Sequence, residues 1–343
     1  MAEVSHQALL YRRTAHRAVI CQICQRRCRI PEGERGFCQT RHNQGGRLFS
    51  EIYGEVTCRR KAPIELKPVY HYLPGSHAYS LGSLGCNFLC PGCQNWELSF
   101  ARVEPLSTQT VYLSPEEAVR LGEASRCQGL SWTYNEPTLW LEYTLDCARL
   151  GKARGMYTNY VTNGFMTVEA LDTIAPFLDV FRVDIKGFSA DTYRRIARLD
   201  KWQGILDVVS RAYHYWHMHV EVVTNLIPGV NDRLEELREL AAWICSELSC
   251  DVPWHITRFY PRWHLRHLPP TAIETMEQAR QAALATGLRY VYLGNLGGHP
   301  ANHTYCPGCG RKLITRNENE PVRNLLSGNH CPICGFFVAG RFL

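Results

Sequence analysis

The chain has no long apolar run. Over its 343 residues no hydrophobic stretch approaches the length that spans a bilayer, so we expect no membrane partner. The N-terminal stretch MAEVSHQALLYRR has neither the apolar centre nor the cleavage site of a secretory signal. We therefore expect a cytoplasmic location, where clustered thiols bind metal more often than they pair as disulfides.

Lysine is absent from residues 1–60, which contain eleven Arg and five Glu. This segment alone accounts for the formal charge of +6, and the remaining residues balance. A basic excess is a common sign of nucleic-acid binding. Metal-bound cysteines are thiolates, however, and four of them around a divalent ion leave a net negative charge that offsets this excess. The basic excess is therefore weak evidence for a nucleic-acid partner.

Short β-like runs alternate with amphipathic stretches between residues 78 and 295. The predicted strands are 78–84, 129–134, 156–162, 180–186, 220–227, 253–259 and 290–295. The predicted helices are 115–126, 138–153, 167–177, 190–217 with a break near Lys201, 232–248 and 271–286. This alternation predicts an α/β fold with a parallel sheet and right-handed crossovers. Six or seven units favour a partial or complete TIM-type (β/α) barrel, and an open doubly wound sheet is the alternative because periodicity cannot close a barrel.

Polar residues follow the ends of the predicted strands. In a β/α barrel the active site is built from the C-terminal ends of the strands and from the loops that follow them. A loop or capping role explains any single one of these residues, but taken together they predict one site. Its candidate members are Asn135, Glu136, Thr162, Asn163, Asp184, Lys186, His255, Arg258 and Asn295.

Three cysteines, Cys86, Cys90 and Cys93, lie within GCNFLCPGCQNW. A structural zinc needs a fourth protein ligand, which Cys58 or His77 would have to supply. An iron–sulfur cluster with one iron free of protein ligands suits a loop with three thiolates. S-adenosylmethionine can chelate such an iron, and its one-electron reduction releases a 5′-deoxyadenosyl radical that abstracts hydrogen from a substrate.

The ordered series of motifs resembles the radical SAM enzymes. More narrowly, it resembles the AmmeMemoRadiSam branch, which is related to the pyruvate formate-lyase activating enzymes. The segments that carry the resemblance are the N-terminal four-cysteine segment, GCNFLCPGCQNWELS, TYNEPT, TNGFM, VDIKGF, IPGVND and GNLGGHPANHTYCPGCG. We accordingly expect an N-terminal cysteine-rich lobe at residues 1–75, a radical SAM barrel at 76–300 and a zinc-ribbon-like module at 301–343.

This resemblance implies roles for the candidate residues. It implies a 4Fe–4S cluster on Cys86, Cys90 and Cys93, with S-adenosylmethionine bound to it. The segments that match the family's contacts to that cofactor supply Asn135 and Glu136 for the methionine amino group, Thr162 and Asn163 after the third strand, and Asp184 and Lys186 for the carboxylate or ribose. His255 and Arg258 could equally be structural or face the substrate, and Asn295 borders the adenine by its position only.

Two further cysteine groups flank the predicted barrel. The C-terminal cysteines, Cys306, Cys309, Cys331 and Cys334, form two C-x2-C knuckles that predict a structural zinc, with an auxiliary iron–sulfur cluster as the alternative. The N-terminal cysteines, Cys21, Cys24, Cys28 and Cys38, have a spacing that both zinc and an auxiliary cluster tolerate, and zinc is slightly preferred. The other five, Cys58, Cys127, Cys147, Cys245 and Cys250, are interpreted as small buried hydrophobic residues.

Three functions follow from these patterns. The first is a radical SAM enzyme that acts on a peptide or small-molecule substrate and takes electrons from a donor such as flavodoxin or ferredoxin. The second is an activating enzyme that installs a glycyl radical on a partner protein. The third, from another class, is a zinc-organised nucleic-acid-binding protein, which would contain zinc, no iron, and bind with a steep dependence on salt.

Overall fold

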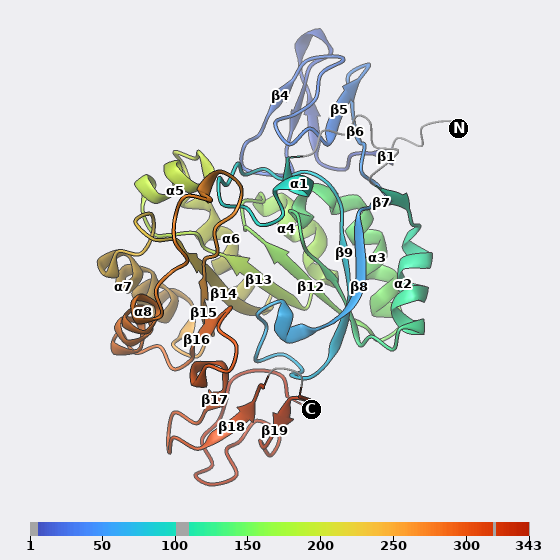
Figure 1. The fold of residues 1–343 in the computed structure, drawn as a ribbon. Helices are drawn as coiled ribbons and strands as arrows, with labels where there is room; N and C mark the ends of the chain where they lie inside the picture. The colour runs from blue at the N-terminus through green and yellow to red at the C-terminus, as the bar shows by residue number, and fades with distance from the viewer. Residues whose placement is uncertain (1–5, 101–109, 318–319, 343) are drawn as a thin grey trace. The chain divides into compact units, whose positions relative to one another are not determined.

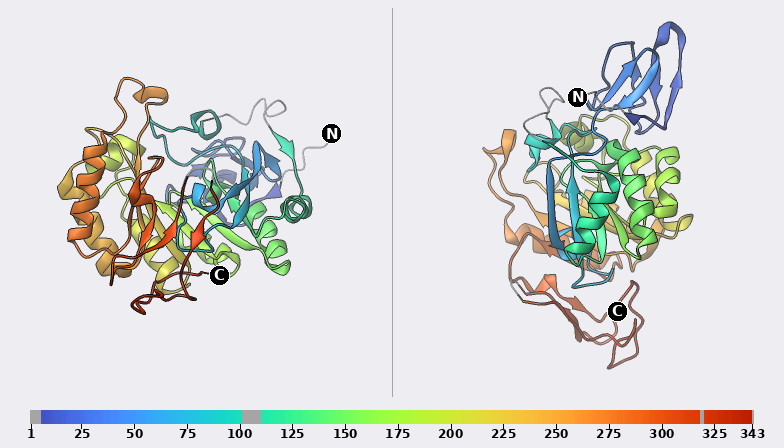
Figure 2. Two further views of the ribbon diagram at one scale, coloured as in Figure 1. Left: turned by 60° about the horizontal axis from the view of Figure 1, so that its bottom comes forward. Right: turned by 90° about the vertical axis from the view of Figure 1, so that its right-hand side faces the viewer.

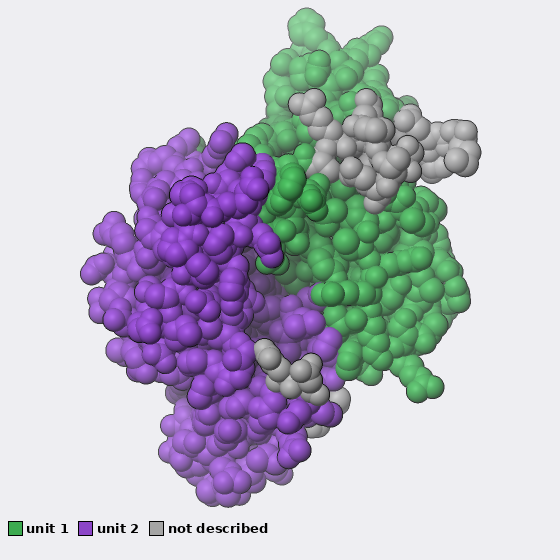
Figure 3. All heavy atoms as spheres, in the orientation of Figure 1, with its two compact units in different colours: residues 1–62, 77–181, 201–218 green, residues 63–76, 182–200, 219–343 purple. Residues whose placement is uncertain are grey.

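The computed structural model describes residues 6–100, 110–317 and 320–342 (Figure 1). The chain forms two compact units, which Figure 3 shows in different colours. Unit 1 comprises residues 1–62, 77–181 and 201–218, and unit 2 comprises residues 63–76, 182–200 and 219–343. The expected three-segment division at 1–75, 76–300 and 301–343 stays a prediction. No helix among the described residues has the length and apolar character needed to cross a membrane.

Unit 1 is built on strands in the order β8-β9-β11-β12, which span Cys58–Pro63, His77–Gly82, Gly129–Trp132 and Tyr157–Thr162. Strand β11 is parallel to both of its neighbours, with Gly129 opposite Ala78 of β9 and Tyr157 of β12. Position 129 has to be glycine, because a Cβ atom there would overlap the Tyr157 ring. The carboxyl ends of these parallel strands therefore lie at one edge of the sheet.

Two helices of unit 1 begin at capping side chains, Ser114 and Thr167. The Ser114 hydroxyl accepts a hydrogen bond from Glu117 N at 3.2 Å and starts α2 (Pro115–Ala124), as the sequence predicts. Helices α2 and α3 (Leu141–Ala153) pack on each other and on β11, on one face of the sheet (Figure 2). The other helices of the unit are α1 (Trp96–Ser99), α4 (Val168–Ile174) and α6 (Gly204–His214).

The N-terminal part of unit 1 consists of short antiparallel strands. Strands β2, β3 and β4 span Tyr11–Arg13, Val19–Cys21 and Arg29–Ile30, and β1, β6 and β5 span His6–Gln7, Arg47–Ser50 and Arg41–Gln44. A further pair joins β7 (Glu55–Val56) to β10 (Val111–Tyr112). This part is fastened to α3 by a buried ion pair in which Arg41 Nη2 lies 2.7 Å from Glu142 Oε2. Removing either partner would leave a buried charge uncompensated.

Unit 2 contains the parallel strands β14 (His219–Leu226), β15 (Trp254–Arg258) and β16 (Val291–Gly294). Its helices are α5 (Ala190–Ala197), α7 (Leu234–Trp243) and α8 (Ile273–Ala285), and α7 packs against α8. A small antiparallel sheet follows near the C-terminus, in which β17 (Thr304–Tyr305), β18 (Lys312–Thr315) and β19 (Arg323–Asn324) are in sequence order. Strand β13 (Val180–Asp184) begins in unit 1 and ends in unit 2.

The predicted elements occur with shifted ends. Each predicted strand and helix has a counterpart, which confirms an α/β fold with mainly parallel strands, whereas closure into a barrel stays a prediction. The predicted helix 190–217 is broken near Lys201, because α5 ends where Arg198 adopts a left-handed φ of 53° and α6 begins only at Gly204. The sequence did not indicate the short strands that precede residue 78.

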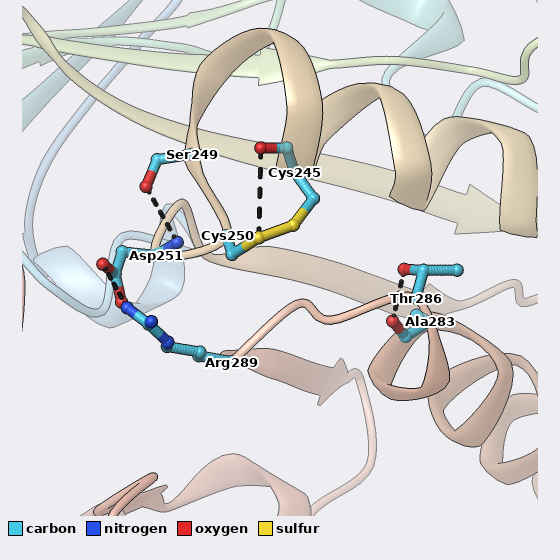
Figure 4. Close-up of a disulfide and its surroundings, with 7 residues drawn as sticks. All are labelled: Cys245, Ser249, Cys250, Asp251, Ala283, Thr286 and Arg289. Atoms are coloured by element: carbon cyan, nitrogen blue, oxygen red, sulfur yellow. Dashed lines mark hydrogen bonds and ion pairs between the residues drawn. A yellow bond between two sulfur atoms is a disulfide. The ribbon is translucent and has the colours of Figure 1, made fainter.

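Two of the cysteines interpreted as isolated buried residues are paired. Helix α7 continues into the π-helical turn η6 (Ile244–Ser249), where Cys245 and Cys250 form a disulfide with their Cα atoms 4.0 Å apart (Figure 4). The buried-hydrophobe interpretation is therefore wrong for these two residues, because the tight end of the helix brings positions five apart into bonding range. It is correct for Cys127 and Cys147, and Cys58 is only half-buried.

Candidate functional site

The three-cysteine motif lies in the loop of residues 83–95 between β9 and α1, here called the cluster loop. All three sulfur-bearing side chains are partly exposed. Cys86 Sγ accepts a hydrogen bond from Phe88 N at 3.4 Å, Cys93 N donates to Cys90 O at 3.2 Å, and Cys93 Sγ lies 3.6 Å from Ser99 Oγ of α1. A loop thus presents three partly buried thiols after the carboxyl end of β9.

Asn135 holds the start of the cluster loop. Its side-chain oxygen accepts from Ser83 N at 3.0 Å, and its Nδ2 donates to Leu84 O at 3.0 Å and to Gly85 O at 3.2 Å. The preceding residue, Tyr134, has a φ of 77°, which is strained for a residue with a bulky side chain. Asn135 thus stands at the predicted edge, and its amide is directed to the backbone of the loop that carries Cys86.

Glu136 is buried and joins two strand ends. Its Oε1 accepts from Thr138 N at 3.0 Å, from Thr138 Oγ1 at 2.6 Å and from Thr162 Oγ1 at 2.7 Å, while Oε2 accepts from Asn163 N at 2.8 Å. Burial raises the pKa of Glu136, although these four donors act in the opposite direction. The carboxylate is therefore a bracket between the ends of β11 and β12.

Asn163 extends this bracket to the cluster loop. Its Nδ2 donates to Asn87 Oδ1 at 2.7 Å and lies 3.8 Å from Cys86 Sγ. Asn87 is fully buried, and its own Nδ2 has no hydrogen-bond acceptor among the described residues. Burial raises the pKa of Cys86 well above its ordinary value, and the Glu136 charge adds to this effect. In unit 1 the structure thus brings together Cys86, Asn135, Glu136, Thr162 and Asn163, which were predicted from separate motifs.

The remaining predicted site residues belong to unit 2. Asp184 Oδ2 lies 2.7 Å from Arg182 Nη1, and its Oδ1 lies 3.5 Å from Lys186 Nζ. Burial would raise the pKa of Asp184, but the charges of Arg182 and Lys186 outweigh burial and lower it. Asn231 Nδ2 donates to Lys186 O at 2.7 Å, which fixes the backbone after β13. The D-x-K pair is therefore an ionised pair at a strand end.

His255 is tied to a carboxylate that the sequence analysis did not single out. His255 Nε2 lies 2.5 Å from Glu221 Oε2, and Glu221 also accepts from Tyr70 N, His71 N and His219 Nε2 at 2.7–2.9 Å. Despite burial, which would raise it, the pKa of Glu221 lies well below its usual value because the histidines donate to the carboxylate. The sequence contains one signal for this network. Glu221 is the acidic residue in the otherwise apolar strand segment VEVV, and a buried carboxylate needs hydrogen-bond donors.

Arg258 and Asn295 lie together near the ends of β15 and β16. Arg258 Nε donates to Thr271 O at 2.8 Å, and Asn295 Nδ2 donates to Arg258 O at 3.0 Å. Asn295 is exposed and has a left-handed φ of 57°. Its backbone oxygen accepts from the Tyr260 hydroxyl at 3.2 Å. Both residues therefore occupy strand ends in unit 2, as the sequence predicts.

The comparisons with known proteins decide the family. Residues 81–244, which include the cluster loop and the Glu136 bracket, match the family model described as the radical SAM superfamily. The chain belongs to the radical SAM superfamily. It is also 37% identical over 333 residues to an uncharacterised protein of Methanocaldococcus jannaschii, covering 96% of this chain and 97% of that protein. A second uncharacterised protein of the same organism is 24% identical over 282 residues, covering 79% of this chain and 76% of that protein.

Solved structures resemble the chain more distantly. A domain of a pyruvate-formate lyase-activating enzyme from Bacteroides vulgatus is 17% identical with a TM-score of 0.41, covering 49% of this chain and 99% of that one. A radical SAM methyltransferase from Sphaerobacter thermophilus is 19% identical with a TM-score of 0.47, covering 65% of this chain and 67% of that one. At these values neither structure indicates a substrate for this radical SAM enzyme.

The cluster loop of this radical SAM enzyme suits the cofactors of the superfamily. Cys86, Cys90 and Cys93 offer three thiolates, which leaves one iron of a 4Fe–4S cluster open for S-adenosylmethionine. Asn163 Nδ2 lies 3.8 Å from Cys86 Sγ and can donate to a thiolate ligand of such a cluster. The three thiols and this neighbouring amide therefore fit the group.

The C-terminal cysteines form a compact group that could bind a metal. Their four sulfur atoms all lie within 4.8 Å of one another, with Cys306 Sγ 3.5 Å from Cys334 Sγ and Cys309 Sγ 3.7 Å from Cys331 Sγ. A tetrahedral zinc with Zn–S bonds of about 2.3 Å separates its sulfurs by about 3.8 Å. The spacing of the group is thus that of ligands around one small ion.

The N-terminal cysteines are arranged differently. They line a cavity of about 10 Å³ together with Ile23, Arg26, Ile30, Gly36, Phe37, Arg41 and Asn87. In the described part of the chain, the C-terminal cysteines are the only set of three or more His, Cys, Asp or Glu ligands with all donor atoms within 4.8 Å. The N-terminal sulfurs therefore surround a space and do not contact one another as a set.

Proposed function

We propose that this radical SAM enzyme reductively cleaves S-adenosylmethionine at a 4Fe–4S cluster held by Cys86, Cys90 and Cys93. The 5′-deoxyadenosyl radical would then abstract hydrogen from a peptide or a small molecule. The observation that carries the proposal is the Glu136–Asn163–Asn87 chain of hydrogen bonds, which ends beside Cys86 within the segment that matches the superfamily. The motif series also leads us to assign the chain to the AmmeMemoRadiSam branch.

The bound cluster would supply one electron to the sulfonium of S-adenosylmethionine, which breaks a carbon–sulfur bond. The protein's own residues position that chemistry. Asn135 fixes the backbone that precedes Cys86 through three hydrogen bonds of 3.0–3.2 Å. Asn163, held at its backbone N by Glu136, keeps its amide beside Cys86 Sγ at 3.8 Å. A rigid loop of this kind limits the movement of the reacting groups.

Binding of the cofactor would use the charged strand ends. The Lys186 ammonium suits the methionine carboxylate and the Asp184 carboxylate suits a ribose hydroxyl or the amino group. Their 3.5 Å separation means that each already orients the other before the cofactor binds. We assign Arg258 and Asn295 to the adenine or substrate side on their position alone. His255 lies near the start of β15, and we assign it a structural role in the hydrogen-bond network of Glu221.

We also propose that the C-terminal cysteines bind structural zinc. Their compact spacing supports one ion, and two of the four, Cys306 and Cys331, are buried in the hydrophobic cluster that also contains Leu313 and Ile314 of β18. An electron donor of the flavodoxin or ferredoxin class and a cytoplasmic location complete the proposal.

The test is production of 5′-deoxyadenosine by anaerobically reconstituted protein with dithionite and S-adenosylmethionine. Cys86→Ala, Cys90→Ala and Cys93→Ala should each reduce turnover below about one-hundredth of the wild-type rate, because the cluster loses a ligand. Cys58→Ala, a half-buried cysteine in β8 of the same unit, is the matched control and should keep wild-type turnover. Full turnover in the three loop variants would refute the proposal.

A further inference from the structure

We propose that the N-terminal cysteines hold a second, fully protein-ligated 4Fe–4S cluster. The inference concerns a site outside the cluster loop and does not depend on cleavage of S-adenosylmethionine. It replaces the slight preference for zinc that the sequence spacing alone suggests.

The N-terminal cysteines leave a space between them that ligands of a single ion would close. A cavity of about 10 Å³ lies within the ring of N-terminal cysteines, which is about the room of one water. Thiolates around a tetrahedral zinc close on the ion at about 2.3 Å and leave no such space between them. A 4Fe–4S core stands between its four cysteines and keeps them apart.

The separation of the sulfurs points the same way. The C-terminal cysteines of the same chain show the arrangement of single-ion ligands, with all four sulfurs within 4.8 Å. The N-terminal cysteines, all within the described residues, do not form such a set. Ligands of an iron–sulfur cube lie farther apart than ligands of one ion, because the cube stands between them. The two four-cysteine groups therefore suit different metal centres.

Buried donors without acceptors line this space. Arg41 Nε, Asn87 Nδ2 and Arg26 Nη2 are buried and have no hydrogen-bond partner among the described residues. Arg41 is 1% exposed and Asn87 is fully buried, so water cannot readily replace a missing acceptor. A buried donor without an acceptor destabilises the folded protein. Inorganic sulfides and thiolates of a cluster would supply acceptors to all three groups, whereas a lone zinc offers only its four thiolates.

The proposed cluster would lie next to the cluster loop. Arg26 Nε donates to Asn87 O at 2.7 Å, so the N-terminal segment is bonded directly to the residue after Cys86. The two segments also approach closely at Gly85, whose φ is 84° and where a Cβ would lie 3.0 Å from Cys38 O and 2.5 Å from Thr40 Cγ2. Only glycine permits this approach, which places the four-cysteine site within the same unit as the three-cysteine loop and beside it.

The decisive protein is the full chain with Cys86→Ala, Cys90→Ala and Cys93→Ala, because its N-terminal cysteines are intact. After anaerobic reconstitution with iron and sulfide, we expect about four irons and four sulfides per chain. Dithionite should then produce an EPR signal that added S-adenosylmethionine does not change, since every iron has a protein ligand. An iron-free triple variant with zinc at this site would overturn the proposal.

A complementary variant carries Cys24→Ala and Cys28→Ala with the cluster loop intact. It should retain about four irons of the roughly eight in the wild type, and Cys58→Ala with Cys127→Ala should retain all of them. If the variant with Cys24→Ala and Cys28→Ala does not fold, the metal content of the wild-type protein decides. About four irons per chain, with one zinc beyond the zinc of the C-terminal cysteines, would refute the second cluster. None of these counts depends on 5′-deoxyadenosine production, so this inference and the proposed function can fail separately.

Discussion

Replacing Glu136 by glutamine tests whether this residue is a structural bracket. The carboxylate accepts four hydrogen bonds, and Oε2 alone serves Asn163 N at 2.8 Å. A glutamine side chain at this position can keep its oxygen toward Thr138 and Thr162, but its NH2 group then faces the Asn163 N–H. Two donors would oppose each other at a buried position.

The expected cost follows from that geometry. Leaving one buried donor without an acceptor costs about 1–3 kcal/mol. Because burial raises the pKa of Glu136, removing its charge relieves a desolvation cost, so we expect the lower part of that range, about 1–2 kcal/mol. This corresponds to a fall in Tm of roughly 2–8 °C for a domain of 150–250 residues. Turnover should fall as well, because Asn163 loses the bond that holds it beside Cys86.

The assay is thermal unfolding of the reconstituted protein under anaerobic conditions, with 5′-deoxyadenosine production measured in parallel. Glu116→Gln, an exposed glutamate on α2 of the same unit, is the control and should change neither. The reasoning is refuted if Glu136→Gln keeps the wild-type Tm while the KM for S-adenosylmethionine rises. That outcome would mean that the carboxylate contacts the cofactor and does not brace the loops.

Three further predictions concern metal and pH. Cys309→Ser or Cys334→Ser should release about one zinc per chain and make the C-terminal module sensitive to limited proteolysis, whereas a variant that keeps its zinc would refute the proposed zinc site. Burial lowers the pKa of His71 to about 3, below the usual value of about 6.5. Between about pH 3 and pH 6.5 the unfolded chain therefore binds a proton at His71 that the folded chain does not. The free energy of unfolding should fall as the pH falls through this range, by up to about 1.4 kcal/mol per pH unit. His71→Gln should flatten the dependence of Tm on pH between about 5 and 6.5, and an unchanged slope would contradict the assignment. Arg26→Gln removes a positive charge beside the proposed N-terminal cluster, which disfavours its reduced and more negative state. The midpoint potential of the cluster should therefore fall by tens of millivolts, where about 59 mV corresponds to a tenfold change in a one-electron equilibrium. A redox titration followed by EPR measures this, and the exposed Arg29→Gln should leave the potential unchanged.

Local pattern was sufficient for the elements and for part of the site. The alternation of strands and helices depends on hydrophobic period and on caps such as Ser114, which a sequence displays directly. The grouping of Asn135, Glu136, Thr162 and Asn163 with Cys86 was predictable because parallel strands place their carboxyl ends at one edge. The partners of each side chain were not predictable, and Glu136 is directed to Thr138, Thr162 and Asn163.

Other features depend on residues that are distant in sequence. Glu221 accepts hydrogen bonds from the backbone of Tyr70 and His71, which lie 151 and 150 positions away, so no local pattern reveals why an acid lies in an apolar strand. The pairing of Cys245 with Cys250 was missed for a different reason. The reducing compartment expected for the chain argued against any disulfide, and the turn of η6 that brings the two sulfurs together shows no signal in the spacing.

By itself the sequence determined the α/β alternation, the three thiols of the cluster loop and the existence of two flanking four-cysteine groups, because periodicity and ligand spacing are local properties. Only the tertiary structure distinguished the two groups. Their spacings both tolerate a zinc, and the difference arises from how the chain folds around the sulfurs: the C-terminal set closes to single-ion distances, whereas the N-terminal set encloses a space lined by Arg26, Arg41 and Asn87. Those three donors come from separate segments of the chain, and folding alone brings them to one cavity.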